Sequence, residues 1–127
     1  MGQPVMQWQI VTKNPERLTQ FYTALFGWRS DANNALGYRR IDTESKHGIG
    51  GVIWPAPPEA HGFVQLFVEV DDVPEAVSKA GSLGAAIIIP PQKLPDGDEL
   101  AILHDPEGIP FGIYKPASGA SAKGPKK

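Results

Sequence analysis

Apolar and polar residues alternate along MQWQIV, residues 6–11. In a strand, this alternation places Trp8 on one face and both Gln7 and Gln9 on the other. Glutamine is a poor strand residue, and its amide needs hydrogen-bond partners once water is excluded. The pattern therefore predicts a strand that carries two amides on one face, and it indicates a polar role for that face.

The period then changes from two residues to that of a helix. Asn14 is a candidate N-cap, Pro15 suits the first helical position, and Glu16 suits the first turn. Gly27 is placed to end the helix as the residue after its last turn. Between them, apolar residues recur with the spacing of one buried helical stripe: Leu18, Phe21, Tyr22, Leu25 and Phe26.

The rest of the chain divides into short apolar runs separated by turn residues. The linker PAPPEAHG, residues 55–62, has three prolines and a glycine and is not expected to form regular structure. A second helix is expected over 71–84, with Val73, Val77 and Ala80 facing inward and Gly84 at its end. The expected strands after the first helix are 28–31, 38–43, 49–54, 64–70, 85–91 (ending in prolines), 99–105 and 109–114.

The two halves of the chain repeat one plan. A shift of 58 residues superposes Gln7 on Gln65 and Asn14 on Asp72, and the order of elements agrees although the identity is low. We predict an α+β fold of two βαβββ modules, in a single domain over residues 1–116. Module one covers about 4–55, the linker 55–62, and module two about 63–115; the alternative is one α+β sheet without internal symmetry.

The amino-acid composition excludes several kinds of functional site. The chain of 127 residues has no cysteine, which excludes disulfides, thiolate nucleophiles and sulfur-ligated metals. The net charge is −2 and the basic residues are scattered, so the sequence shows no basic patch of the kind that binds nucleic acid.

The start resembles no secretory signal and no stretch could span a membrane, so a cytoplasmic location is expected. Residues 117–127, rich in small residues and lysine, are expected to be disordered, with a binding role as the lesser alternative.

FYTALFGW at 21–28, VEVDDV at 68–73 and DPEG at 105–108, at these distances, resemble the vicinal oxygen chelate superfamily. That superfamily includes glyoxalase I, bleomycin-resistance proteins and extradiol dioxygenases, and the resemblance covers essentially residues 5–115. It implies paired βαβββ modules whose curved sheets form a cup, with the helices outside and the ligand inside. Related domains frequently pair their modules, so a homodimer is expected.

Metal-dependent members of that superfamily commonly hold a divalent ion with two histidines and two carboxylates. By resemblance, the histidine positions fall on Gln7 and Gln65, and the carboxylate positions fall on Gly112 and on Gly51 or Val52. Neutral amides are weak donors for transition metals, and glycine and valine offer no side-chain donor. We therefore expect a member of the superfamily with no metal ligands and no cofactor. This expectation argues against an enzyme.

Strand alternation places further residues beside those positions. The candidate ligand-binding residues are Gln7, Gln9, Trp54, Gln65, Phe67, Glu69 and Tyr114. Such amides and rings suit a compact polar or aromatic molecule. In the alternative, the amides satisfy one another or water in a filled core, and Glu69, near a strand end, is merely solvated.

The sequence does not support a histidine metal site, a phosphate-binding loop or a serine nucleophile. His47 and His61 lie in expected loops, and His104 and Asp105 point to opposite faces of a strand, so metal binding by a histidine is not expected. GIGG at 48–51 lacks the lysine and helix of a phosphate-binding loop, and no GxSxG elbow is present.

The leading hypothesis is a metal-free small-molecule binding protein, without partners among nucleic acids or membranes, that sequesters or senses its ligand. One alternative is a lyase, isomerase or dioxygenase-like enzyme with a displaced metal site or acid-base chemistry through Glu69 and Tyr114, although no catalytic residue can be assigned. Another is a partner or regulatory module with a filled cup.

Overall fold

The structure, a computed structural model, describes residues 2–57 and 59–117. Its contacts divide the chain into two compact units. The N-terminal unit spans Gln7–Gln65, and the C-terminal unit combines the residues up to Met6 with those from Leu66 on. The predicted disordered tail lies outside the described residues except for Ala117.

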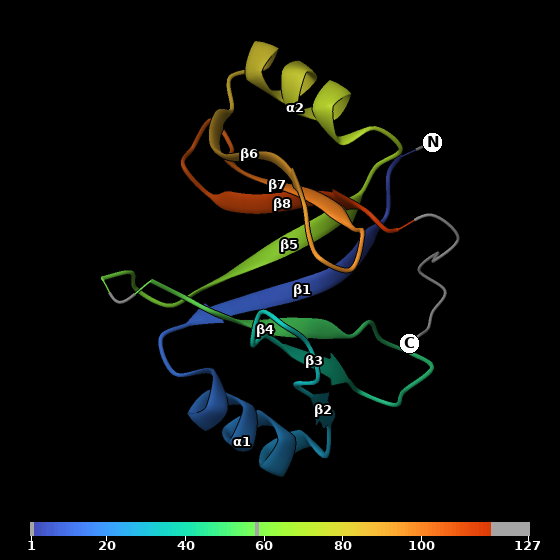
Figure 1. The fold of residues 1–127 in the computed structure, drawn as a ribbon, viewed down its shortest axis with the longest axis vertical. Coiled ribbons are helices and arrows are strands. Elements are labelled where there is room, and N and C mark those ends of the chain that lie inside the picture. Colours follow the sequence, from blue (N-terminus) through green and yellow to red (C-terminus); the bar gives the residue numbers. More distant parts are fainter. Residues whose placement is uncertain (1, 58, 118–127) are drawn as a thin grey trace. The chain divides into compact units, whose positions relative to one another are not determined.

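The N-terminal unit contains four strands in the order β2-β3-β4-β1. They are β1 (Val5–Thr12, within this unit from Gln7), β2 (Arg29–Asp31), β3 (Arg39–Asp42) and β4 (Gly51–Pro55). β1 runs parallel to β4, and β3 pairs antiparallel with both β2 and β4. Helix α1 (Pro15–Phe26) lies on one side of these strands (Figure 1).

The C-terminal unit repeats this arrangement with the strand order β5-β8-β7-β6. Its elements are β5 (Phe63–Glu69, within this unit from Leu66), α2 (Val73–Ser82), β6 (Ala86–Lys93), β7 (Glu99–His104) and β8 (Pro110–Lys115). Val73, Val77, Ala101, Leu103 and Ile113 form its buried core. Two βαβββ modules in an α+β fold are thus confirmed.

Both helices begin where their capping residues predict. The Asn14 side chain accepts a hydrogen bond from the Arg17 backbone N–H at 3.1 Å, and the Asp72 side chain accepts one from Glu75 at 3.0 Å. Pro15 occupies the first turn of α1. Gly27 ends α1 in the left-handed conformation with φ 74°, which glycine adopts at little cost.

The apolar stripe of α1 is less buried than its spacing predicts. Phe21, Leu25 and Phe26 are each more than half exposed, and Thr19 is the buried residue of the helix. Periodicity identifies the face that a helix turns toward its unit, but not how much of that face the unit covers. α1 contacts the two short strands β2 and β4, which cannot cover twelve residues of helix.

The prolines of β6 do not end that strand. We expected the strand to stop at residue 91, but it continues through Pro90 and Pro91 to Lys93. β6 is the outer strand of its unit and pairs with β7, with irregular register between Ile87 and Gln92. An outer strand can tolerate prolines because their missing N–H groups need not face a neighbouring strand.

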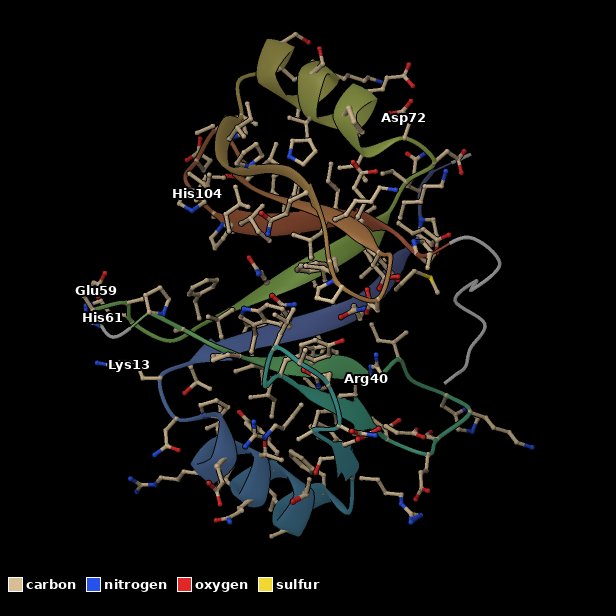
Figure 2. All side chains as sticks on the ribbon, viewed as in Figure 1. Lys13, Arg40, Glu59, His61, Asp72 and His104 are labelled. Carbon is tan, nitrogen blue, oxygen red and sulfur yellow. The ribbon has the colours of Figure 1, made fainter. Side chains whose placement is uncertain are left out.

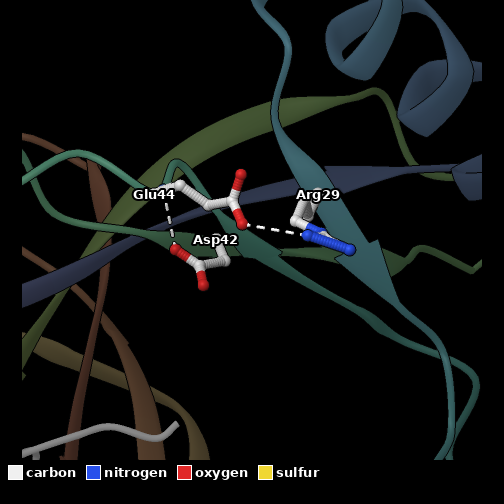
Figure 3. Close-up of polar contacts among 3 residues, drawn as sticks. All are labelled: Arg29, Asp42 and Glu44. Carbon is white, nitrogen blue, oxygen red and sulfur yellow. Dashed lines mark hydrogen bonds and ion pairs between the residues drawn. The ribbon is translucent and has the colours of Figure 1, made fainter.

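A polar contact links β2 to the end of β3 and the loop that follows it (Figure 3). Arg29 Nη1 lies 3.1 Å from Glu44 Oε2, and the Glu44 backbone N–H donates to Asp42 Oδ1 at 2.7 Å. The second bond supports Glu44 in its positive φ of 60°. Both side chains of the ion pair are at least half exposed, so the pair is worth at most about 1 kcal/mol.

Among the described residues, no helix has both the length and the apolar character needed to cross a membrane. The linker forms no helix or strand in its described part except for Pro55, the last residue of β4.

Candidate functional site

The two faces of β1 carry different chemistry. The Trp8 ring lies 5.4 Å from that of Trp28, which in turn stacks on Tyr22 of α1 at 5.8 Å. Trp8 therefore faces the helix. Because side chains alternate along a strand, Gln7 and Gln9 lie on the face away from α1, as the sequence predicts.

Strand register extends that face across the unit. Gln9 pairs with Val52 of β4, and Val52 pairs with Arg40 of β3. Directly paired residues share a face, so these three side chains form a row away from α1. Figure 2 labels Arg40 beside β3 and β4.

The two central amides meet directly. Gln65 Nε2 donates a hydrogen bond to Gln9 Oε1 at 2.7 Å, and the two side chains are 4% and 6% exposed. This pairing is what the filled-core alternative predicts. It is incomplete, however, because the buried Gln65 Oε1 has no hydrogen-bond partner among the described residues. One strong acceptor on this face is therefore left over.

Aromatic rings stand beside the amide row. Trp54 stacks on Tyr38 with ring centroids 4.8 Å apart and planes at 14°. The Arg40 guanidinium lies 5.6 Å from the centre of the Tyr38 ring, and its Nη2 donates to Tyr38 Oη at 3.2 Å. We call the combined set the amide face: Gln9, Tyr38, Arg40, Val52, Trp54 and Gln65.

The other predicted residues lie in the C-terminal unit. Phe67 pairs with Gly112, and Glu69 pairs with Tyr114. The Phe67 and Tyr114 rings are 5.9 Å apart, and both side chains are buried. Glu69 is half-buried, and its backbone N–H donates to the carbonyl of Pro4 at 3.0 Å. These four residues share one face of β5 and β8, opposite the core beneath α2.

The positions of the superfamily's metal ligands do not fit a metal ion. A Cβ built on Gly112 would lie 2.5 Å from Phe67 Cζ, so the buried ring fills the space where a carboxylate would stand. A Cβ on Gly51 would meet the Trp8 ring on the helix side, and Val52, on the amide face, is apolar. Gln7 and Gln65 supply amides alone. No group of three or more metal-ligating His, Cys, Asp or Glu residues occurs in the part of the chain that is described.

None of the three histidines belongs to the amide face. His47 and His61 are exposed in loops, as expected, and His104 is the last residue of β7 in the C-terminal unit. Figure 2 marks His61 in the loop between β4 and β5 and His104 near the turn between β7 and β8.

Sequence reasoning missed two residues of the amide face, Tyr38 and Arg40. Tyr38, Arg39, Arg40 and Ile41 do not alternate cleanly between apolar and polar, so the face of Arg40 could not be assigned. The available signal was the spacing of two between Tyr38 and Arg40, which puts both on one face.

A family model and two curated relatives match the sequence of this chain. The family model described as "Glyoxalase-like domain" matches residues 7–114. Two curated relatives, from Mycobacterium bovis and Mycobacterium tuberculosis, carry the name "Putative glyoxylase CFP32" and are each 29% identical over 111 residues. The match covers 86% of this chain but 42% of each relative, so the chain spans less than half of their length.

Solved structures agree on the fold. A hypothetical protein, BH1468 from Bacillus halodurans, superposes with a TM-score of 0.69 at 13% identity, covering 95% of this chain and 99% of that one. A methylmalonyl-CoA epimerase variant from Streptomyces coelicolor superposes with a TM-score of 0.62 at 15% identity, covering 91% of this chain and 96% of that one. At these identities the likeness concerns the fold alone.

Proposed function

The chain belongs to the glyoxalase-like domain family of the vicinal oxygen chelate superfamily, and we propose that it is a metal-free member that binds a small molecule. Its ligand is compact and polar or aromatic, and binding serves to sequester or sense it. The observation that carries the proposal is the amide face, where a buried acceptor, Gln65 Oε1, lacks a partner among the described residues beside a stacked pair of rings. Convergent polar groups beside aromatic surface are typical of ligand sites.

A thermal-shift screen of small metabolites on the full chain tests this proposal. A ligand that binds only the folded state, present at one hundred times its Kd, adds about 2.7 kcal/mol of stability. We expect at least one polar aromatic compound to raise Tm by several degrees. Gln9→Met should abolish that shift because it removes the amide at similar volume, whereas Gln92→Met on the exposed outer strand β6 should keep it.

Two outcomes contradict the proposal. One is a screen in which no compound raises Tm. The other is a shift of equal size in Gln9→Met and the parent chain, which would place the ligand elsewhere.

Catalysis is the second candidate function. The mycobacterial relatives carry the name glyoxylase, and Glu69 and Tyr114 are register neighbours on one face, where a carboxylate and a phenol could exchange protons with a ligand. The chain matches less than half of those relatives, so their activity is a weak guide. Unchanged turnover of Glu69→Gln on any substrate found in the screen would remove this acid-base mechanism.

We also propose that two copies of the chain pair. Phe21, Leu25 and Phe26 of α1 are 55–58% exposed and lie in the last two turns of the same helix. An apolar surface of this kind can be buried against its own copy across a two-fold axis. In sedimentation velocity we expect a dimer that Leu25→Glu converts to a monomer, while Leu83→Glu, at the exposed end of α2, leaves it intact. A parent chain that sediments as a monomer contradicts the pairing.

A further inference from the structure

One side of helix α1 carries an apolar stripe. Leu18, Phe21 and Leu25 follow one another at spacings of three and four residues, which places them on the same side of a helix. Phe21 and Leu25 are 56% and 58% exposed, and Leu18 is half-buried. Thr19, the buried residue of α1, lies on another side, because each residue turns a helix by about 100°. We call Leu18, Phe21 and Leu25 the α1 stripe.

The first turn of α1 carries a cation at an unfavourable place. Arg17 is exposed, and it precedes Phe21 by four residues, so its side chain continues the α1 stripe toward the N-terminus. The N-terminal end of a helix has partial positive charge, which favours anions such as Glu16 and disfavours cations. Arg17 therefore gains more from a negative partner outside its own helix.

The last turn of α1 has the opposite charge and no cation of its own. The final carbonyl groups of a helix carry partial negative charge, and α1 has no basic residue in its last turn. Gly27 donates its backbone N–H to the Thr23 carbonyl at 2.9 Å. Arg29, two residues further on, places its Nη1 3.1 Å from Glu44 Oε2. The C-terminal end of α1 can therefore accept a cation from outside the helix.

An antiparallel copy of α1 satisfies both helix ends at once. When two α1 stripes pack about a two-fold axis that crosses them near Phe21, Leu18 of one copy faces Leu25 of the other. Arg17 then lies beside the C-terminal turn of the other α1, next to the half-exposed ring of Phe26. A parallel arrangement would place Arg17 against Arg17 and leave both C-terminal ends without a cation. The charges therefore favour the antiparallel pair.

We propose that the α1 stripe is a dimer interface, in which two copies pack antiparallel and Arg17 of each copy contacts the C-terminal end of the other helix. This inference rests on the pairing proposed above, and it names the surface, the orientation and the charged contact of that pair. It is independent of the small-molecule proposal because α1 contains no residue of the amide face.

Cysteine cross-linking of the full chain tests the interface. The chain has no native cysteine, so a single introduced thiol reports on one position. A disulfide needs Cα atoms about 4.4–6.8 Å apart. We expect Phe21→Cys to form a disulfide-linked dimer on oxidation in air, because this position lies near the two-fold axis.

Two further cysteine variants distinguish the antiparallel from the parallel pair. Leu18→Cys alone should not form a linked dimer, since its two copies are separated by about 10 Å along the helix direction. Affinity-tagged Leu18→Cys mixed with untagged Leu25→Cys should give a tagged chain linked to an untagged one. In a parallel pair, Leu18→Cys would link to itself and the mixed product would be absent.

Arg17→Glu tests the charged contact in analytical sedimentation over a range of protein concentrations. It should raise the dissociation constant of the dimer about tenfold, because the reversed charge meets a like partial charge at both ends of a two-fold pair. Glutamate suits the first turn of a helix, so this variant should fold as well as the parent chain. Lys46→Glu, the matched control, makes the same change of charge in the exposed loop after β3 and should leave the dissociation constant within about twofold.

Three outcomes overturn the inference although the copies still pair. They are a dimer in which Phe21→Cys does not cross-link, a Leu18→Cys chain that links to itself as efficiently as Phe21→Cys, and a dimer that Arg17→Glu leaves unchanged. A parent chain that sediments as a monomer overturns the pairing as well. Ligand binding at the amide face is decided separately, by the thermal-shift screen.

Discussion

Gly51→Ala is expected to lower the free energy of unfolding by about 2–3 kcal/mol. Gly51 is buried and pairs with Trp8, and a Cβ at this position would lie 2.5 Å from the Trp8 carbonyl oxygen as well as against its ring. A backbone oxygen within a paired strand cannot move without breaking the ladder. The Trp8 ring is also held, by its contact with Trp28. Urea unfolding followed by circular dichroism measures the loss.

Gly48→Ala is the control for Gly51→Ala. Gly48 has no atom within 4 Å of a built Cβ and no positive φ, so alanine there should change stability by less than about 0.5 kcal/mol. If the two variants unfold at the same urea concentration, the close contact between β1 and β4 is not as described.

Gly112→Glu is expected to destabilise the protein by about 3 kcal/mol or more without creating a metal site. This substitution restores the carboxylate that resemblance places at the position. The side chain would have to displace the Phe67 ring, which is 3% exposed and whose Cδ1 lies 2.8 Å from a built Cβ. The variant would also bury a charge beside an apolar ring. Thermal melting with and without nickel, zinc or manganese measures both the loss of stability and any stabilisation by a metal ion.

Gly81→Glu is the matched control for Gly112→Glu. Gly81 is exposed in α2, and a Cβ there makes an ordinary contact of 3.6 Å with Ile87. Glutamate is a better helix former than glycine, so this variant should be neutral or slightly stabilised. A folded Gly112→Glu protein whose Tm rises with stoichiometric metal would show that donors still converge there.

Local sequence signals predicted the helices because each helix begins at its own N-cap residue. Asn14 and Asp72 cap α1 and α2 as their positions predict, and the repeat in the sequence appears as two modules of the same element order. The incorrect prediction, that β6 ends at its prolines, depends on where the strand lies in the sheet. Pro90 and Pro91 would end an inner strand, and nothing local to them reveals that β6 is an outer one.

The site was less predictable than the fold. Alternation alone put Gln7 and Gln9 on the face opposite Trp8, and the resemblance implied that this face points away from the helices. That Gln9 and Gln65 bond each other depends on strands 56 residues apart, which a local pattern cannot bring together. Arg40 entered the amide face only through its register with Val52.

The central claim is that glutamine, valine and glycine at the superfamily's ligand positions leave no site for a divalent cation. Elemental analysis of the full chain, purified without chelators and then dialysed against nickel, zinc, iron or manganese, tests it most directly. We predict far less than one metal ion per chain for every metal. Stoichiometric metal that is lost on mutation of Gln7 or Gln65 would contradict the account.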